Sequence, residues 1–186
     1  MITLIYGGSS SGKSAFAENY VCASKCKNKY YMATMSANDN ESIKRVDNHR
    51  KMRAGKGFVT LEQPVDIVDA IYGIDQIDQG DFSTEGNDDI ILLECLSNLV
   101  ANEMFRDGLV NSSDYCVAKI IDDLKKLSQK VSSIVIVSNN IFEDGREYDA
   151  GTKDYLRALG TLNQKLSVIS DEVYEVVVGI GIKIKG

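Results

Sequence analysis

Short apolar runs of strand length alternate along the chain with segments of helical period. Several runs, such as IILL and IVIV, are apolar at every position. Strands that are apolar on both faces are typical of a mainly parallel sheet covered by helices. The pattern predicts strands at Ile2–Tyr6, Lys29–Ala33, Ile90–Leu93, Ile134–Ser138, Val173–Val178 and Ile182–Ile184.

The segments between these runs predict the helices. These are expected at Lys13–Ser24, Glu41–Arg53, Val65–Ile71, Ser97–Arg106, Ser113–Val131 and Thr152–Ser170. Regular alternation of strand and helix indicates an α/β fold. Residues 179–181 are too few for a crossover helix, so we expect the last two strands to pair as a short antiparallel edge.

The length favours one domain over residues 1–186, because 186 residues can bury a substantial core but rarely make two domains. No internal repeat or low-complexity segment interrupts the chain. The polar, glycine-punctuated stretch Gly73–Asp89 is interpreted as a surface loop rather than a domain linker.

Charge and cysteine content narrow the function classes. A formal net charge of −6 argues against general nucleic-acid binding, which needs a broad basic face. The first apolar run is too short for a signal peptide or membrane anchor, so we expect no membrane insertion. The cysteines lack paired zinc-site spacing and are expected to be free thiols in a reducing cytoplasm. They are Cys22, Cys26, Cys95 and Cys116.

The stretch GGSSSGKS fits the phosphate-loop pattern G-x-x-x-x-G-K-[ST] between a predicted strand and a predicted helix. Small residues let backbone N–H groups point at phosphate oxygens, and the helix N-terminus adds partial positive charge. Lys13 is expected to reach the β- and γ-phosphates, and Ser14 to bind Mg²⁺. The candidate nucleotide-binding residues are Gly7, Gly8, Ser9, Ser10, Ser11, Gly12, Lys13 and Ser14.

A second metal-organising carboxylate is expected at the end of another strand. Glu94 is the first acidic residue after the run IILL, and ligands bind at the carboxyl ends of parallel strands. The alternative is that Glu94 is a charge near the start of the helix predicted from Ser97. We favour the metal role, in which Ser14 and Glu94 would organise the ion.

The single histidine, His49, lies in a basic segment. Between Ile43 and Lys56 the basic residues are Lys44, Arg45, Arg50, Lys51, Arg53 and Lys56, against Asp47 alone. On a helix, Arg45, His49 and Arg53 share one face. Neighbouring cations favour the neutral, nucleophilic imidazole and would hold a polyphosphate. The alternative is an ordinary solvated basic face.

Several segments together resemble the bifunctional adenosylcobinamide kinase / adenosylcobinamide-phosphate guanylyltransferases of cobalamin biosynthesis. They cover nearly the whole chain in that family's order, and the histidine helix and the C-terminal ending are the most specific. The segments are LIYGGSSSGKSAFAE, YYMATMSANDNESIKRVDNHRKMRAGKGFVTLEQPVDI, ILLECLSNLVANEMF and LNQKLSVISDEVYEVVVGIGIKIK.

The resemblance implies a P-loop, RecA-like fold and two linked transfers. The first moves a γ-phosphate from ATP or GTP to adenosylcobinamide, and the second moves GMP from GTP through a covalent intermediate on His49. Glu62 would bind guanosine or is a surface charge near a strand end, and Thr34 would lie in the ligand crevice. Asn102 matches a family asparagine or is a solvent-facing helix residue. The resemblance also implies Mg²⁺, a corrinoid substrate and a homotrimer.

Four positions depart from the family pattern and leave alternatives open. The departures are Ser10 for an arginine, Phe58 for a tryptophan, Asn140 for a glutamate, and a changed order around Tyr155 and Arg157. Losing an arginine near phosphates weakens triphosphate binding or transition-state stabilisation. The loop that carries Arg146 is a candidate lid. The alternatives are a single-activity small-molecule kinase and a nucleotide-binding protein without catalysis.

Overall fold

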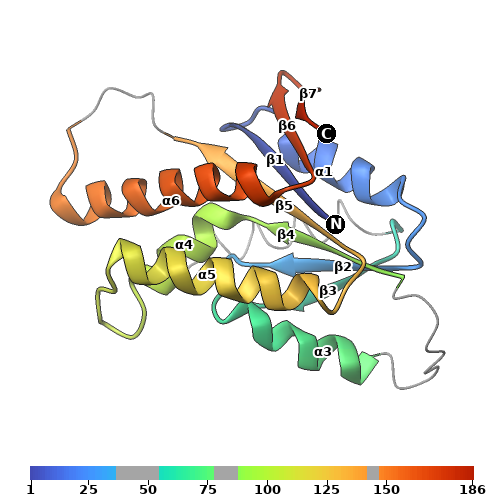
Figure 1. Cartoon of the computed structure of the whole chain (residues 1–186), viewed down its shortest axis with the longest axis horizontal. Coiled ribbons are helices and arrows are strands. Elements are labelled where there is room, and N and C mark those ends of the chain that lie inside the picture. Colours follow the sequence, from blue (N-terminus) through green and yellow to red (C-terminus); the bar gives the residue numbers. More distant parts are fainter. Residues whose placement is uncertain (37–54, 78–87, 142–146) are drawn as a thin grey trace.

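A computed structural model describes residues 1–36, 55–77, 88–141 and 147–186. Its centre is a seven-stranded sheet in the order β3-β2-β4-β5-β1-β6-β7 (Figure 1). All neighbouring strands are parallel except β6 and β7, as predicted for the C-terminal edge. The strands are β1 (Ile2–Gly8), β2 (Asn28–Ala33), β3 (Phe58–Glu62), β4 (Asp89–Glu94), β5 (Ser133–Asn140), β6 (Glu172–Val177) and β7 (Ile180–Lys185).

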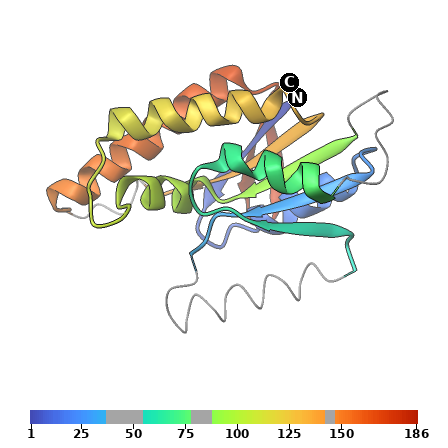
Figure 2. The ribbon, with the colours of Figure 1, turned by 90° about the horizontal axis from the view of Figure 1, so that it is seen from below.

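Helices cover both faces of the sheet. In Figure 2, α5 and α6 lie on one side of the strands and α1 on the other, and α3 and α4 share the side of α5 and α6. The predicted helix Glu41–Arg53 falls outside the described residues. The described helices are α1 (Lys13–Cys22), the 3₁₀ turn η1 (Ile67–Asp69), α3 (Ala70–Ile77), α4 (Leu96–Met104), α5 (Ser113–Ser128) and α6 (Ala150–Ile169).

Three sequence predictions are wrong in detail. The strand β3 was missed because it is a half-exposed edge strand without an apolar run. The helix predicted at Val65–Ile71 begins later, because Asp66 has a left-handed backbone with φ 48° and only the 3₁₀ turn follows it. The helix then continues to Ile77, into the stretch that we interpreted as a loop from Gly73.

The alternation of β4 positions the candidate site. Ile91 and Leu93 lie in the core under α3–α6, whereas Ile90 and Leu92 lie in the core under α1. Because successive side chains point to opposite faces, Glu94 falls on the α1 face at the carboxyl end of the strand. In the described part of the chain, no helix is long and apolar enough to cross a bilayer.

Candidate nucleotide and metal site

The loop between β1 and α1 has a backbone that only glycine fits at two positions. A Cβ added at Gly7 would meet the Val176 carbonyl oxygen at 2.7 Å. Gly12 has φ +88°, and an added Cβ there would lie 3.0 Å from the Cα of Gly179. The close approach of the end of β6 to Gly7, and of the following turn to Gly12, therefore explains why the loop needs both glycines.

The loop is fixed by its own hydrogen bonds. The Ser11 N–H donates to the Gly8 carbonyl at 3.2 Å, and the Gly179 N–H donates to the Ser11 carbonyl at 2.7 Å. Lys13 Nζ donates to the Gly8 carbonyl at 2.9 Å, so the lysine folds back over the loop. This is the cradle predicted for phosphate groups, with α1 beginning at Lys13.

Ser14 and Glu94 meet at the start of α1. The Ser14 hydroxyl donates a hydrogen bond to Glu94 Oε1, and the Tyr31 hydroxyl donates to Glu94 Oε2 at 3.2 Å. Glu94 thus faces the phosphate loop. One hydroxyl, one carboxylate and nucleotide phosphates are the oxygen ligands that Mg²⁺ typically takes in P-loop proteins. The donor set therefore fits Mg²⁺ held jointly with a nucleotide.

The described residues hold no group of three His, Cys, Asp or Glu side chains placed to bind a metal without such a nucleotide. Among the described residues, Ser14 and Glu94 are the side chains that would hold such an ion together with the nucleotide. So few protein ligands are physically reasonable, because Mg²⁺ keeps several waters and relies on substrate phosphates for the rest of its shell.

Lys13 is an unusually buried cation, with only 7% of its surface exposed. Burial lowers the pKa of Lys13, and the nearby Cys95 and Glu94 act in the opposite direction without cancelling that effect. A bound triphosphate would supply further negative charge. The site is therefore arranged to gain electrostatic stabilisation when an anion enters.

Sequence reasoning missed a polar cluster beside the loop. Asn139 lies opposite Gly7 in the pairing of β5 with β1, and its Nδ2 donates to Ser97 Oγ at 2.6 Å. Ser97 Oγ lies 3.0 Å from Cys95 Sγ, and the Tyr155 hydroxyl donates to the Ser97 carbonyl at 3.2 Å. Strand parity could have identified Asn139, because Val135 and Val137 lie on the same face of β5.

Thr34 and Asn102 have structural contacts. The Thr34 hydroxyl donates to the Cys95 carbonyl at 2.8 Å, and Asn102 Nδ2 donates to the carbonyls of Thr34 at 2.8 Å and Pro64 at 3.0 Å. Asn102 therefore ties two loops to α4 and is not merely a solvent-facing residue. Glu62 ends β3 opposite Ala33 and is exposed, two strands away from Glu94.

Most of the basic segment lies outside the described residues, including Arg45, His49 and Arg53, and so does Arg146. Two described residues bond to its surroundings. Thr34 precedes the segment and bonds to the end of β4, and Lys56, the last residue of the segment, bonds to α1. Lys56 Nζ lies 2.5 Å from Oε2 of Glu18, a side chain of α1 that is only 2% exposed.

Phe58, Tyr155 and Arg157, which depart from the family pattern, each have defined contacts. Phe58 packs edge-on against Tyr31, with ring centroids 6.3 Å apart, and Tyr31 lies on the strand next to Glu94. Arg157 donates to Ser113 Oγ at 3.0 Å and pairs with Asp154 at 2.9 Å. Arg157 is thus engaged with α5, whereas Tyr155 reaches the Ser97 cluster.

Two solved ATPase structures share this fold at low identity. The ATPase domain of one protein matches with a TM-score of 0.56 at 18% identity, covering 94% of this chain and 68% of that chain. An ATPase of a bacterial type III secretion system matches with a TM-score of 0.56 at 11% identity, covering 98% and 56%. These likenesses confirm the predicted P-loop NTPase fold.

Sequence comparisons match proteins of one kind. The bifunctional adenosylcobalamin biosynthesis protein CobU of Salmonella typhimurium is 29% identical, and its Escherichia coli counterpart is 28% identical, each over the full length of both chains. The model of the CobU family, described as cobinamide kinase / cobinamide phosphate guanyltransferase, matches residues 3–184. The chain therefore belongs to the cobinamide kinase / cobinamide phosphate guanyltransferase family of transferases.

Proposed function

We propose that this protein phosphorylates an adenosylcobinamide-type corrinoid with ATP or GTP and then transfers GMP from GTP to the phosphorylated product. The single observation that supports the proposal most strongly is the meeting of Ser14 and Glu94 beside a preformed phosphate loop. In a chain of this family, that arrangement fits a nucleotide-dependent transferase. The described cysteines are free thiols, as is typical of proteins that function in the reducing cytoplasm.

The phosphoryl transfer would use residues that the loop already orients. Loop N–H groups and Lys13 would bind the β- and γ-phosphates, and Ser14 and Glu94 would hold Mg²⁺, which neutralises charge on the phosphates. The corrinoid hydroxyl oxygen forms a bond to the γ-phosphorus as the bond from that phosphorus to the β-phosphate oxygen breaks. The hydroxyl proton passes to solvent, and the nucleoside diphosphate leaves.

The guanylyl transfer would proceed through His49. An imidazole nitrogen forms a bond to the α-phosphorus of GTP as pyrophosphate leaves, giving a covalent GMP adduct. An oxygen of the corrinoid phosphate then attacks the same phosphorus and releases the histidine. Arg45 and Arg53 would hold the triphosphate, and Glu62 the guanosine. Thr34, which precedes the basic segment, bonds to the end of β4 at Glu94, and this supports delivery of the segment to the same nucleotide.

Family resemblance also supports a homotrimer with nucleotide sites near subunit boundaries. Light scattering coupled to size-exclusion chromatography tests this part of the proposal directly. A mass of about three chains of 20.5 kDa would support it, and a monomer at micromolar concentration would contradict it.

The adduct provides the sharpest test of the second transfer. The protein is incubated with Mg²⁺ and α-phosphate-labelled GTP, denatured, and examined for bound label. We expect an acid-labile, base-stable adduct that disappears in His49→Ala and passes to added adenosylcobinamide phosphate. Absence of label under conditions where GTP binds would contradict the role of His49 and favour a single-activity kinase.

A further inference from the structure

We propose that Asn139 is a catalytic residue of the phosphoryl transfer, whose side-chain Oδ1 accepts a hydrogen bond from the hydroxyl that receives the γ-phosphate. Ser97 acts as the positioning residue that holds this carboxamide. The inference rests on the proposed kinase function and assigns to that site a residue that sequence comparison did not single out.

Asn139 lies at the end of a central strand of the sheet. In the sheet, β5 lies between β1, which leads into the phosphate loop, and β4, which ends at Glu94. Asn139 pairs with Gly7, the first residue of the loop, and Val137 pairs with Glu94. Asn139 therefore lies two residues beyond the level of Glu94, at the carboxyl edge where ligands of parallel sheets bind.

The Asn139 side chain lies on the α1 face of β5. Val135 and Val137 belong to the core under α1, whereas Ile134 and Ile136 belong to the core on the opposite face. Ser138 follows the second set and donates to Asn163 of α6 at 2.6 Å. Asn139 follows the first set, so its side chain is on the same face as Glu94 and the start of α1.

Hydrogen bonds of Nδ2 orient the side-chain amide of Asn139. Nδ2 of Asn139 donates to Ser97 Oγ at 2.6 Å and lies 3.8 Å from Cys95 Sγ, so its two hydrogens face two acceptor atoms. Ser97 is only 7% exposed, and its backbone carbonyl is bound by the Tyr155 hydroxyl. The hydrogen bonds of the Asn139 side chain to described residues both use Nδ2, which leaves Oδ1 available as an acceptor.

The amide oxygen of Asn139 is chemically complementary to the hydroxyl that receives the phosphate. An amide oxygen only accepts hydrogen bonds, and phosphate oxygens at neutral pH offer no hydrogen to it. The partner of Oδ1 must therefore be a donor, and the reacting alcohol brings one in its O–H group. Asn139 would orient this hydroxyl toward the γ-phosphorus while remaining neutral throughout. Orientation of this kind is a recognised source of rate enhancement.

The test separates the hydroxyl from the nucleotide. Adenosylcobinamide phosphorylation is measured for wild type, Asn139→Ala and Ser97→Ala, with Asn28→Ala as the matched control. Asn28 donates to Asp89 at the opposite edge of the sheet. For Asn139→Ala we expect kcat to fall about 10- to 100-fold, with the Kd for the nucleotide within about threefold of wild type. Formation of the GMP adduct, which uses no hydroxyl, should be retained.

Ser97→Ala should affect kcat less, by about 3- to 10-fold, and Ser97→Thr should restore it because threonine keeps the hydroxyl. If Asn139→Ala does not fold, Asn139→Ser is assayed in its place, and its melting temperature shows whether it is folded. A kcat within about threefold of wild type in Asn139→Ala would overturn the inference, as would an equal loss of nucleotide affinity. A wild-type protein that phosphorylates no corrinoid would instead overturn the proposed function.

Discussion

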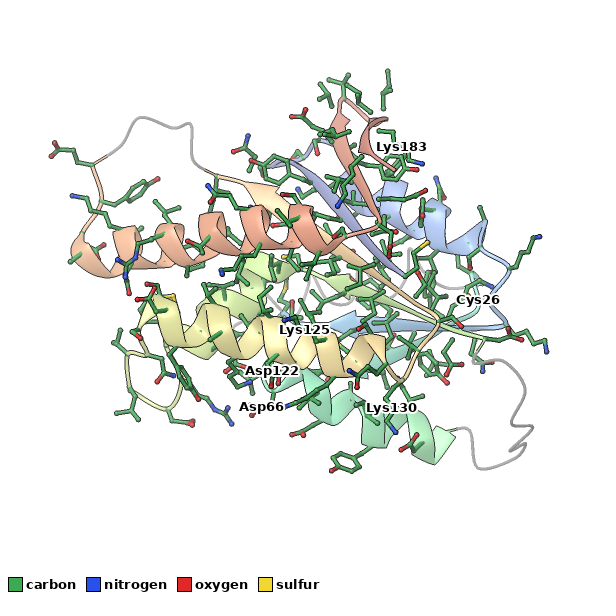
Figure 3. The ribbon with its side chains drawn as sticks, in the orientation of Figure 1. Cys26, Asp66, Asp122, Lys125, Lys130 and Lys183 are labelled. Carbon is green, nitrogen blue, oxygen red and sulfur yellow. The ribbon has the colours of Figure 1, made fainter. Side chains whose placement is uncertain are left out.

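The backbone N–H of Gly179 donates a hydrogen bond to the carbonyl of Ser11 at 2.7 Å and joins the C-terminal strand pair to the middle of the phosphate loop. Glu172 of β6 accepts a hydrogen bond from Tyr20 of α1, and this bond holds the strand pair to α1. Glu172 also binds Lys183 of β7, labelled in Figure 3. The last residues of the chain thus support the geometry of a loop near its beginning.

The first prediction concerns this contact. In Gly12→Ala, an added Cβ would lie 3.0 Å from the Gly179 Cα at a left-handed φ of +88°, whereas Gly55 has φ +85° with open space around its Cα. Both substitutions incur the left-handed backbone cost of about 1–2 kcal/mol. Only Gly12→Ala should also weaken nucleotide binding, by about tenfold or more, in a titration with a fluorescent nucleotide. Equal affinity in the two variants would contradict the steric argument.

The second prediction is that removing the buried charge of Lys13 costs no stability in the empty protein. Burial lowers the pKa of Lys13, so the charged form is disfavoured by folding. This cost exists below the folded pKa and disappears as pH rises toward the ordinary value of 10.5. We expect Lys13→Met to melt at or about 2 °C above wild type near pH 7 and to lose nucleotide binding.

Calorimetry with and without nucleotide checks this prediction. Wild type should gain melting temperature when nucleotide is added, whereas Lys13→Met should gain almost none. A melting temperature several degrees below wild type in the empty variant would show that Lys13 supports the fold rather than the ligand.

The third prediction concerns pH and Glu172. The hydrogen bond from Lys183, together with that from Tyr20, lowers the pKa of Glu172 below its ordinary value of 4.5. The carboxylate therefore stabilises the fold fully above that value, and the contribution is lost as pH falls through the folded pKa. Glu172→Gln should melt about 3 °C below wild type at pH 7, and the difference should shrink below about pH 4.

Melting curves recorded between about pH 3 and pH 8 check the Glu172 prediction. A difference between Glu172→Gln and wild type that stays constant over this range would mean that the charge of Glu172 contributes nothing. In that case, the contacts of the strand pair with α1 would depend on shape alone.

The fourth prediction concerns a buried ion network under α4 and α5. Lys119 binds Glu103 at 2.7 Å, Asp123 at 2.8 Å and Asp66, labelled in Figure 3, at 2.9 Å. Burial alone would lower the pKa of Lys119, but these carboxylates outweigh it and raise that pKa. Lys119→Met would leave Glu103, which is only 2% exposed, with the more distant Arg106 at 4.0 Å as its cation, and should cost about 3–5 kcal/mol in urea unfolding.

Lys126→Met is the matched control for Lys119→Met. Lys126 also pairs with an acidic residue one turn away on α5, Asp122 at 2.6 Å, but both side chains are largely exposed. Its loss should leave the midpoint of urea unfolding close to that of wild type. Similar costs for the two variants would contradict the importance of burial. Adding Glu103→Gln to Lys119→Met should recover part of the lost stability.

Local patterns predicted most of the fold and the core of the site. The phosphate loop was predictable because its glycines and Lys13 lie between a strand and a helix, and Glu94 because it ends an apolar run. The missed strand β3 has no apolar run, since it forms an exposed edge. The order of the strands depends on long-range pairing, so the sequence could not show that β5 lies between β1 and β4.

The comparison of Asn139 with Asn140 illustrates the same limit. Family resemblance drew attention to Asn140, which departs from the usual glutamate. The side chain that bonds to Ser97 beside the loop belongs to Asn139. Alternation along β5 gives Asn139 the face of Val135 and Val137, but only the pairing of β5 with β1 places it level with Gly7 of the loop.

One reaction tests the central claim most directly. Adenosylcobinamide, GTP and Mg²⁺ are incubated with wild type, Glu94→Gln, Lys13→Ala and His49→Ala, and the corrinoid products are identified by mass. We predict adenosylcobinamide-GDP with wild type, adenosylcobinamide phosphate alone with His49→Ala, and a loss of about 100-fold or more in phosphorylation with Glu94→Gln. Unmodified corrinoid after incubation with wild type that binds GTP would contradict the account.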